Sequence, residues 1–231
     1  MPVPSPLGSR QTVAAMLVLT AVTGLVDAVS YLRLGHVFVA NMTGNVVFLG
    51  FSITPGSGLS AIASAIAIGG FVVGAFAGGR LAHTLAEVGP RRWLGIAFTG
   101  EAIILGLVAL LTGTGVLPFG GGAGYATIAV LGAALGVQNS TVRHLGARDL
   151  TTTVLTLTLT GLTADSALAG GPGAQPHRRL GSIAAMLAGA AAGAGILRWS
   201  PTAVIALAAV VVAVVAGAFA TAGAPSTAAS R

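Results

Sequence analysis

Residues 24–45 read GLVDAVSYLRLGHVFVANMTGN, and this stretch decides how the chain folds. An acid, Asp27, and two amides, Asn41 and Asn45, interrupt an otherwise apolar run. Polar side chains are costly inside a membrane, so they mark places where a membrane helix is buried, broken or functional. A weaker version of the pattern returns between Gly136 and Thr158. The fold therefore depends on whether each copy crosses a membrane or turns back within it.

The composition is that of a membrane protein. Of the 231 residues, 55% are hydrophobic and only 7% are charged, whereas soluble domains carry about 25% charged residues. The net charge of +6 comes from arginines that occur singly or in pairs between apolar runs. This spacing is typical of loops that set membrane topology, and it argues against a nucleic-acid partner. The chain contains no cysteine, which excludes disulfides and thiolate metal sites.

Eight apolar segments are candidates for membrane spans, because a helix needs about 20 residues to cross a bilayer. They are Thr12–Leu32, Val37–Ile53, Leu59–Leu81, Trp93–Thr112, Gly124–Val142, Leu150–Ala169, Leu180–Leu197 and Thr202–Ala222. The sixth contains alternating threonines that would indicate a strand in water, but a lone strand cannot satisfy its backbone in lipid. We therefore predict a helix there, or one broken near Thr156. The tail, residues 223–231, is predicted to be disordered.

The two halves of the chain resemble each other when the sequence is shifted by about 112 residues. Gly24 then aligns with Gly136, and Asp27 aligns with Asn139. Small residues spaced by four pack membrane helices closely, and they occur in both halves. We assign helix packing to Gly70, Gly74, Gly78, Gly189 and Gly193. The chain is thus predicted to be a single integral membrane domain over residues 1–231, with internal repeats at approximately 12–112 and 124–222.

The arginines favour six spans over eight. If all eight segments cross, seven arginines lie on one side and four on the other. If the second and sixth segments enter and return, only Arg33 and Arg198 lie opposite the other nine, which obeys the positive-inside rule better. We predict an all-α polytopic membrane helical bundle with two internal repeats, six spans and two broken or re-entrant segments. Eight spans are the alternative.

Three acids are expected at membrane depth: Asp27, Glu101 and Asp165. Burial disfavours the charged form of an acid, so each is a candidate for proton coupling. The alternative for Asp27 is a hydrogen-bonded acid that only bridges helices. Asp165 also lies near a segment end, where water could solvate it.

A cluster of polar residues at 41–45 is the candidate substrate or ion site. A glycine among side-chain donors and acceptors weakens a helix, and transporters place their ligands at such breaks. The alternative is a kink held by amide hydrogen bonds. The candidate binding residues from both halves are Asp27, Asn41, Thr43, Gly44, Asn45, Gln138, Asn139 and Thr156.

A family resemblance is carried by three motifs: Gly24-x-x-Asp27-Ala28, the run Leu34-Gly35-x-x-Phe38-x-Ala40-Asn41-Met42-Thr43-Gly44-Asn45, and Leu135-Gly136-Val137-Gln138-Asn139 followed by Leu150-Thr151-Thr152-Thr153. These motifs resemble the YoaK family, a bacterial inner-membrane family described as a domain of unknown function. The resemblance covers nearly the whole chain, and it implies six membrane helices and a bacterial inner-membrane location. Many relatives carry Thr-Gly-Thr where this chain has Thr156-Leu157-Thr158. The resemblance implies no substrate.

The sequence contains no HExxH, GxSxG, P-loop or Rossmann motif, and its histidines lack metal-ligand spacing. We therefore expect no enzyme, no metal and no cofactor. The expected function is a small secondary transporter or exporter of a small solute, proton-coupled through Asp27 or Glu101. The alternative is a non-transporting membrane scaffold or assembly protein. The expected partners are the lipid bilayer and a small solute, with no nucleic acid, and the oligomeric state is open.

Overall fold

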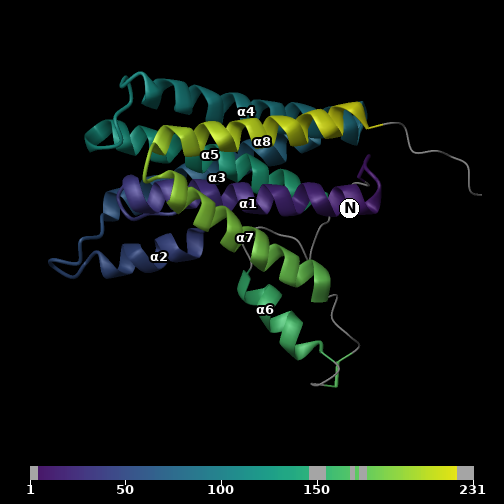
Figure 1. The fold of residues 1–231 in the computed structure, drawn as a ribbon, viewed down its shortest axis with the longest axis horizontal. Coiled ribbons are helices and arrows are strands. Elements are labelled where there is room, and N and C mark those ends of the chain that lie inside the picture. The colour runs from purple at the N-terminus through teal and green to yellow at the C-terminus, as the bar shows by residue number, and fades with distance from the viewer. Residues whose placement is uncertain (1–4, 146–154, 167–169, 172–175, 223–231) are drawn as a thin grey trace, which may run out of the picture.

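The computed structural model describes residues 5–145, 155–166, 170–171 and 176–222 (Figure 1). Every regular element in these ranges is a helix: α1 Ser9–Arg33, α2 Met42–Phe51, α3 Ala61–Thr84, η1 Ala86–Val88, α4 Pro90–Gly113, α5 Gly121–His144, α6 Leu155–Ala164, α7 Pro176–Ile196 and α8 Pro201–Thr221. Six of them, α1, α3, α4, α5, α7 and α8, are long and apolar enough to cross a membrane. The predicted all-α, polytopic helical bundle is confirmed.

Local capping sets several helix boundaries. The Ser60 hydroxyl accepts a hydrogen bond from the N–H of Ala63 at 3.1 Å, and so begins α3. Ser200 does the same for α8 through the N–H of Ala203, also at 3.1 Å, with a proline at the first helical position. Both contacts satisfy backbone donors that a helix start leaves without partners. Two of the long helices, α3 and α8, therefore begin where the sequence supplies a serine cap.

The second predicted segment does not cross the membrane. Only residues 42–51 form a helix, α2, which is about 15 Å long against a hydrocarbon core of about 30 Å. Residues 37–41 of the predicted segment are not helical, and the chain turns back after α2 to begin α3. The eight-span alternative is therefore wrong for this segment. The sixth segment contains α6, and part of that prediction and the whole 223–231 tail lie outside the described residues.

The helices pack in pairs that relate the two halves of the chain. α1 packs along α7, α3 packs along α5, and α4 packs along α8. α1 also contacts α8, and α5 also contacts α4. In the two halves α1 corresponds to α5, α3 to α7 and α4 to α8. The contact of α1 with α7 therefore corresponds to that of α5 with α3, and the contact of α1 with α8 corresponds to that of α5 with α4. Figure 1 shows the short helices α2 and α6 below the long ones, displaced toward opposite ends of the bundle.

Glycines make equivalent close contacts in the two halves. Gly24 of α1 lies against the backbone of Met186 in α7, and Gly136 of α5 lies against the backbone of Phe71 in α3. In both places an added Cβ would overlap main-chain atoms. The same holds for Gly74 of α3 against Ala133 of α5, and for Gly189 of α7 against Ala21 of α1. The remaining predicted packing glycines, Gly70, Gly78 and Gly193, lie at the same two helix contacts.

The two ends of the bundle differ in charge. Arg33 at the end of α1 donates to the carbonyl of Leu197 at 3.4 Å, so the ends of α1 and α7 lie together. At the other end, Arg91 donates to the carbonyl of Ala220 at 2.6 Å. Within the described ranges, the first end holds Arg33 and Arg198, and the second holds Arg10, Arg80, Arg91, Arg92, Arg143, Arg178 and Arg179.

Candidate functional site

The site begins with a re-entrant segment that we call the hook, residues 34–51, which consists of the non-helical residues 34–41 and then α2. Asn45 closes the hook on itself. Its Oδ1 accepts from the N–H of Phe38 at 2.9 Å, and its Nδ2 donates to the carbonyl of Phe38 at 2.6 Å. Non-helical backbone is tolerated at membrane depth only where its polar groups are satisfied. The buried Asn45 amide therefore serves the fold.

Asp27 ties the hook to α1. Its Oδ1 accepts from the N–H groups of Val39 at 2.8 Å and Ala40 at 3.0 Å. Asp27 lies six residues before the end of α1, which places it about 9 Å along the helix from that end. The side chain is only 4% exposed. Its second oxygen, Oδ2, has no hydrogen-bond partner in the described part of the chain.

An aromatic cluster holds the hook against α1. The ring of Phe38 stacks on Tyr31 with centroids 5.1 Å apart and on Phe48 with centroids 5.6 Å apart. Gly44 makes room for this ring, because a Cβ there would come within 2.7 Å of the Phe38 side chain. Two residues of the run 41–45 therefore have structural roles. Gly44 leaves space for the Phe38 ring, and Asn45 hydrogen-bonds to the Phe38 backbone.

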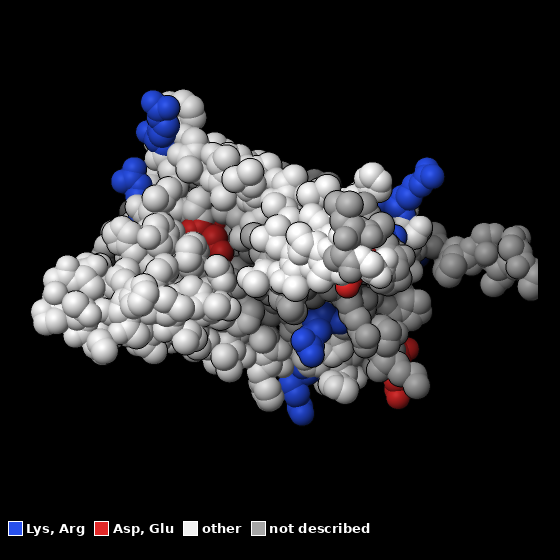
Figure 2. Space-filling view, turned by 90° about the horizontal axis from the view of Figure 1, so that it is seen from below, with Lys and Arg blue, Asp and Glu red and all other residues white. Residues whose placement is uncertain are grey.

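A cavity of about 410 Å³ lies beside Asp27, and we call it the polar cavity. Its walls come from α1, the hook, α6 and α7. The lining residues are Thr23, Asp27, Ala40, Asn41, Thr43, Gly44, Val47, Phe48, Thr156 and Met186. Figure 2 shows acidic atoms set in a recess among uncharged side chains on the face seen from below Figure 1. The volume falls in the range of about 300–1,000 Å³ that small-molecule sites occupy.

The polar cavity brings together five of the eight predicted binding residues. Asp27, Asn41, Thr43 and Gly44 come from the first half of the chain, and Thr156 comes from the second. Among the described residues, the polar groups of Asn41, Thr43 and Thr156 make no hydrogen bond, and Asn41 does not cap α2. These groups and Asp27 Oδ2 therefore remain available to a bound molecule.

The other three predicted binding residues lie outside the lining. The Asn45 side chain is hydrogen-bonded to the backbone of Phe38, as described above. Gln138 is buried behind the cavity, where its Nε2 donates to the hydroxyl of Thr23 at 3.0 Å. Asn139 donates to the carbonyl of Leu135 on its own helix at 2.9 Å. Gln138 thus contacts the cavity lining through Thr23, which itself donates to the carbonyl of Leu19.

The two other acids differ sharply in their surroundings. Glu101 in α4 is buried, and neither of its carboxylate oxygens has a hydrogen-bond partner in the part of the chain that the structure describes. It does not line the polar cavity. Asp165 follows the end of α6, has a side chain that is 46% exposed, and pairs with Arg179 at 2.9 Å. Asp165 therefore lies in a partly buried ion pair just after the end of α6.

Sequence reasoning missed the apolar walls of the cavity. Phe48, Val47 and Met186 line it, but apolar residues carry no signal in a chain that is 55% hydrophobic. Thr23 was also missed. Its position one turn before Asp27 on the same helix face could have indicated it, since residues four apart are neighbours on a helix.

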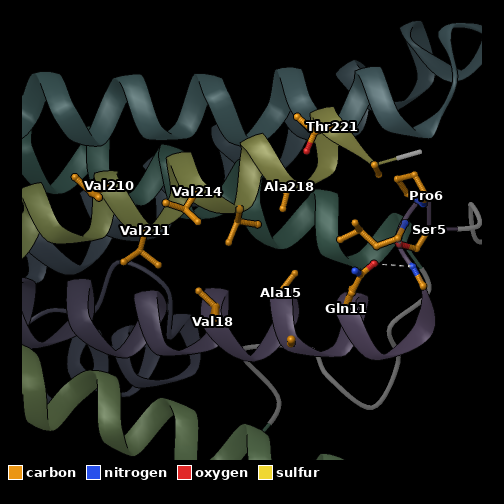
Figure 3. Close-up of a pocket in the computed structure, with 15 residues that line it drawn as sticks. Ser5, Pro6, Gln11, Ala15, Val18, Val210, Val211, Val214, Ala218 and Thr221 are labelled. Atoms are coloured by element: carbon orange, nitrogen blue, oxygen red, sulfur yellow. Dashed lines mark hydrogen bonds between the residues drawn. The ribbon is translucent and has the colours of Figure 1, made fainter. Parts of the chain in front are cut away.

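A larger cavity of about 880 Å³ lies elsewhere, between the start of α1 and the end of α8 (Figure 3). Its walls are apolar along most of their length, with Val18 on α1 facing Val211 and Val214 on α8. Gln11 lies at its polar end and accepts from the N–H of Gly8 at 3.3 Å. None of the residues that line this groove carries a buried polar atom without a partner, as Asp27 Oδ2 does in the polar cavity. It is the kind of surface that lipid tails cover.

Comparison with known proteins agrees with this architecture. A family described as "Protein of unknown function (DUF1275)" matches residues 15–218. The chain is 34% identical over 161 residues to the UPF0700 transmembrane protein YoaK of Bacillus subtilis (strain 168). The aligned region covers 68% of this chain and 67% of that protein. No solved structure matches the chain. The resemblance to YoaK is confirmed, and the chain belongs to the DUF1275 family of membrane proteins.

Proposed function

We propose that the chain is a small secondary transporter or exporter that binds a small solute in the polar cavity. One observation carries the proposal: a cavity at membrane depth is lined from both halves of the chain by polar groups without partners. Among these groups Asp27 Oδ2 is the buried one, since Asn41 is half-buried and Thr43 and Thr156 are exposed. A buried polar atom without a partner costs about 1–3 kcal/mol. A bound solute would offset that cost.

The arrangement of the halves supports alternating access. Each half contributes three long helices and one short one, and an odd number of spans inverts the second half relative to the first. Transporters with inverted repeats bind their substrate where broken helices from the two halves meet near the midplane. Here α2 and α6 both reach the polar cavity, through Thr43 and Thr156.

The charge distribution supports an orientation. The arginine-rich end of the bundle, which holds the start of α1 and the end of α8, would face the cytoplasm by the positive-inside rule. We place the protein in the bacterial inner membrane on this basis and on its relation to YoaK. The hook would then enter from the outer side, and α6 from the cytoplasmic side.

Binding is favoured over catalysis by the chemistry of the lining. Of its ten residues, Asp27 alone is ionisable, and no serine, cysteine or histidine stands beside it as a nucleophile or base. Proton coupling is proposed through Asp27 or Glu101, the two buried acids. Asp27 lines the cavity and Glu101 does not, so Asp27 is the stronger candidate.

The test compares two threonines on the same helix. Thr156→Val removes a hydroxyl from the cavity, whereas Thr160→Val removes an exposed hydroxyl that does not line it. A solute library would first be screened for compounds that raise the unfolding temperature of the purified protein, since a ligand at 100 times its Kd stabilises the folded state by about 2.7 kcal/mol. Transport of the hits would then be measured in proteoliposomes. We expect Thr156→Val to weaken binding and transport, and Thr160→Val to change neither.

The scaffold alternative makes the opposite prediction. A scaffold needs partner surfaces but no solute, so cavity variants such as Thr156→Val and Asn41→Ala would be silent in every assay. The packing glycines do not supply a partner surface, because Gly74 and Gly189 make their contacts inside the chain. A library without a single stabilising solute, together with silent cavity variants, would favour the scaffold.

A further inference from the structure

The charge of the polar cavity restricts what it can bind. Asp27 is the one ionisable residue in its lining, and the carboxylate has one oxygen, Oδ2, without a partner among the described residues. None of the other ionisable groups on or beside the elements that form its walls lines the cavity; these are Arg10, Tyr31, Arg33, His36, Asp165, His177, Arg178, Arg179 and Arg198. Glu101 of α4 does not line it either. With no positive side chain in its walls, the cavity would repel an anion and attract a cation, and this effect is strong away from water.

The size of the polar cavity and its apolar wall further restrict the solutes that it can bind. A volume of about 410 Å³ is far larger than the roughly 30 Å³ that a water molecule occupies, so a bare metal ion would leave most of it unfilled. Phe48 lines the wall, supported by Phe38 with ring centroids 5.6 Å apart. An aromatic face attracts ammonium groups, quaternary ones included. Val47 and Met186 add apolar surface for the rest of a solute.

We infer that the solute is a small organic cation with an apolar body, and that it exchanges with a proton at Asp27 Oδ2. This inference rests on the proposed transport function and names its substrate class. One oxygen cannot hold a proton and an ammonium group at the same time. The proton therefore leaves Oδ2 for water on one side when the cation binds, and it returns from the other side when the cation leaves. One positive charge moves each way, so the exchange of a monovalent cation is electroneutral.

The contacts with the hook explain how Asp27 can gain and lose a proton while the local structure is kept. The N–H groups of Val39 and Ala40 donate to Oδ1, and an acid oxygen accepts them whether the other oxygen is protonated or not. Asp27→Asn therefore mimics the protonated state: its amide oxygen can keep both backbone contacts while the negative charge is lost. This variant separates the charge of Asp27 from its role in holding the hook.

The experiment uses benzyltrimethylammonium, a permanent cation with an aromatic body. Its binding to the purified full chain is measured by titration calorimetry across pH, in two buffers with different ionisation enthalpies, so that proton release is counted. In acid we expect about one proton released for each cation bound, and an affinity that falls up to tenfold for each pH unit lowered. Asp27→Asn should weaken binding at least tenfold and abolish both the proton release and the pH dependence. Glu87→Gln, a change at an exposed acid on η1, should alter none of these values. Thermal unfolding of each variant verifies that it is folded.

Each other outcome overturns the inference in a recognisable way. Binding without proton release, or equal binding to Asp27→Asn, would remove Asp27 from the exchange. Stabilisation by alkali cations but not by benzyltrimethylammonium would replace the organic cation with a metal ion. Binding of neutral or anionic solutes alone, weakened by Thr156→Val, would overturn the substrate class and leave the transport proposal intact. If no solute of any charge binds, both proposals fail.

Discussion

Asn45→Ala should release the hook without unfolding the bundle. The Asn45 side chain makes both contacts to the Phe38 peptide, one at 2.9 Å to its N–H and one at 2.6 Å to its carbonyl. The helix of the hook, α2, packs mainly against α3, so the long helices keep their contacts with one another when the hook opens. The loss should therefore be local.

The size of the effect follows from the two peptide groups left without partners. A fully buried polar group that loses its partner costs about 1–3 kcal/mol, or about 2–6 kcal/mol for the two together. The Asn45–Phe38 contacts are partly buried, which favours the lower value. Since about 1.4 kcal/mol corresponds to a factor of ten, even the lower value raises the population of the open hook by about 30-fold.

The assay is the labelling rate of a buried thiol. The chain has no cysteine, and Val39 is fully buried in the hook, so Val39→Cys provides a background in which N-ethylmaleimide reports opening. We expect Asn45→Ala to raise the labelling rate by about 30-fold or more, in proportion to the population of the open state. Ser52→Ala is the matched control, because it removes an exposed hydrogen bond to the carbonyl of Leu49 at the end of α2. An unchanged rate in Asn45→Ala, or equal rises in the two variants, would refute the reasoning.

Three further predictions concern the helix packing, the contacts of Asp27 and the course of the hook. Gly74→Leu should abolish the monodisperse peak in size-exclusion chromatography, because its side chain would overlap the backbone of α5, whereas Gly69→Leu on the same helix points into open space and should not; equal behaviour of the two would contradict this. Asp27→Ala should lower the midpoint of thermal unfolding, by about 2–4 °C for each kcal/mol lost, because two buried N–H groups lose their acceptor. Asp27→Asn should keep most of that stability, and a midpoint as low as that of Asp27→Ala would sink the explanation. In intact cells, Arg33→Cys and Ser57→Cys should both react with a membrane-impermeant maleimide from the same side; labelling from opposite sides would mean that the segment between them crosses.

The membrane architecture could be predicted from local features. Apolar length identifies the six long helices, and the arginine distribution correctly disfavours a crossing between Arg33 and Ala61. The amides and the glycine at 41–45 also mark the break correctly, because polar groups and glycine weaken a membrane helix wherever it lies. These properties depend on residues close in sequence, so they can be read without knowing the fold.

The roles of individual polar residues could not be predicted in the same way. Asn45 was expected to face a ligand, yet it satisfies the peptide of Phe38. Asp27 reaches the backbone at positions 39 and 40, and that contact exists only once the hook has folded back. Asp165 was expected at membrane depth or, near a segment end, in water, whereas its ion pair with Arg179 across the connection from α6 to α7 has no signal in the sequence. In each case a contact between distant residues, or a boundary without a local signal, decides the outcome.

The glycine contacts described above also determine which parts of the molecule can move. Where Gly24 and Gly189 bring α1 and α7 into main-chain contact, few side chains lie between the helices, so little space exists for one helix to slide or rotate past the other. The same holds for α3 and α5 at Gly74 and Gly136. These pairs should behave as two rigid bodies joined through α4 and α8. The polar cavity would then open to either side of the membrane through movement of the short helices α2 and α6 and through tilting of one helix pair relative to the other.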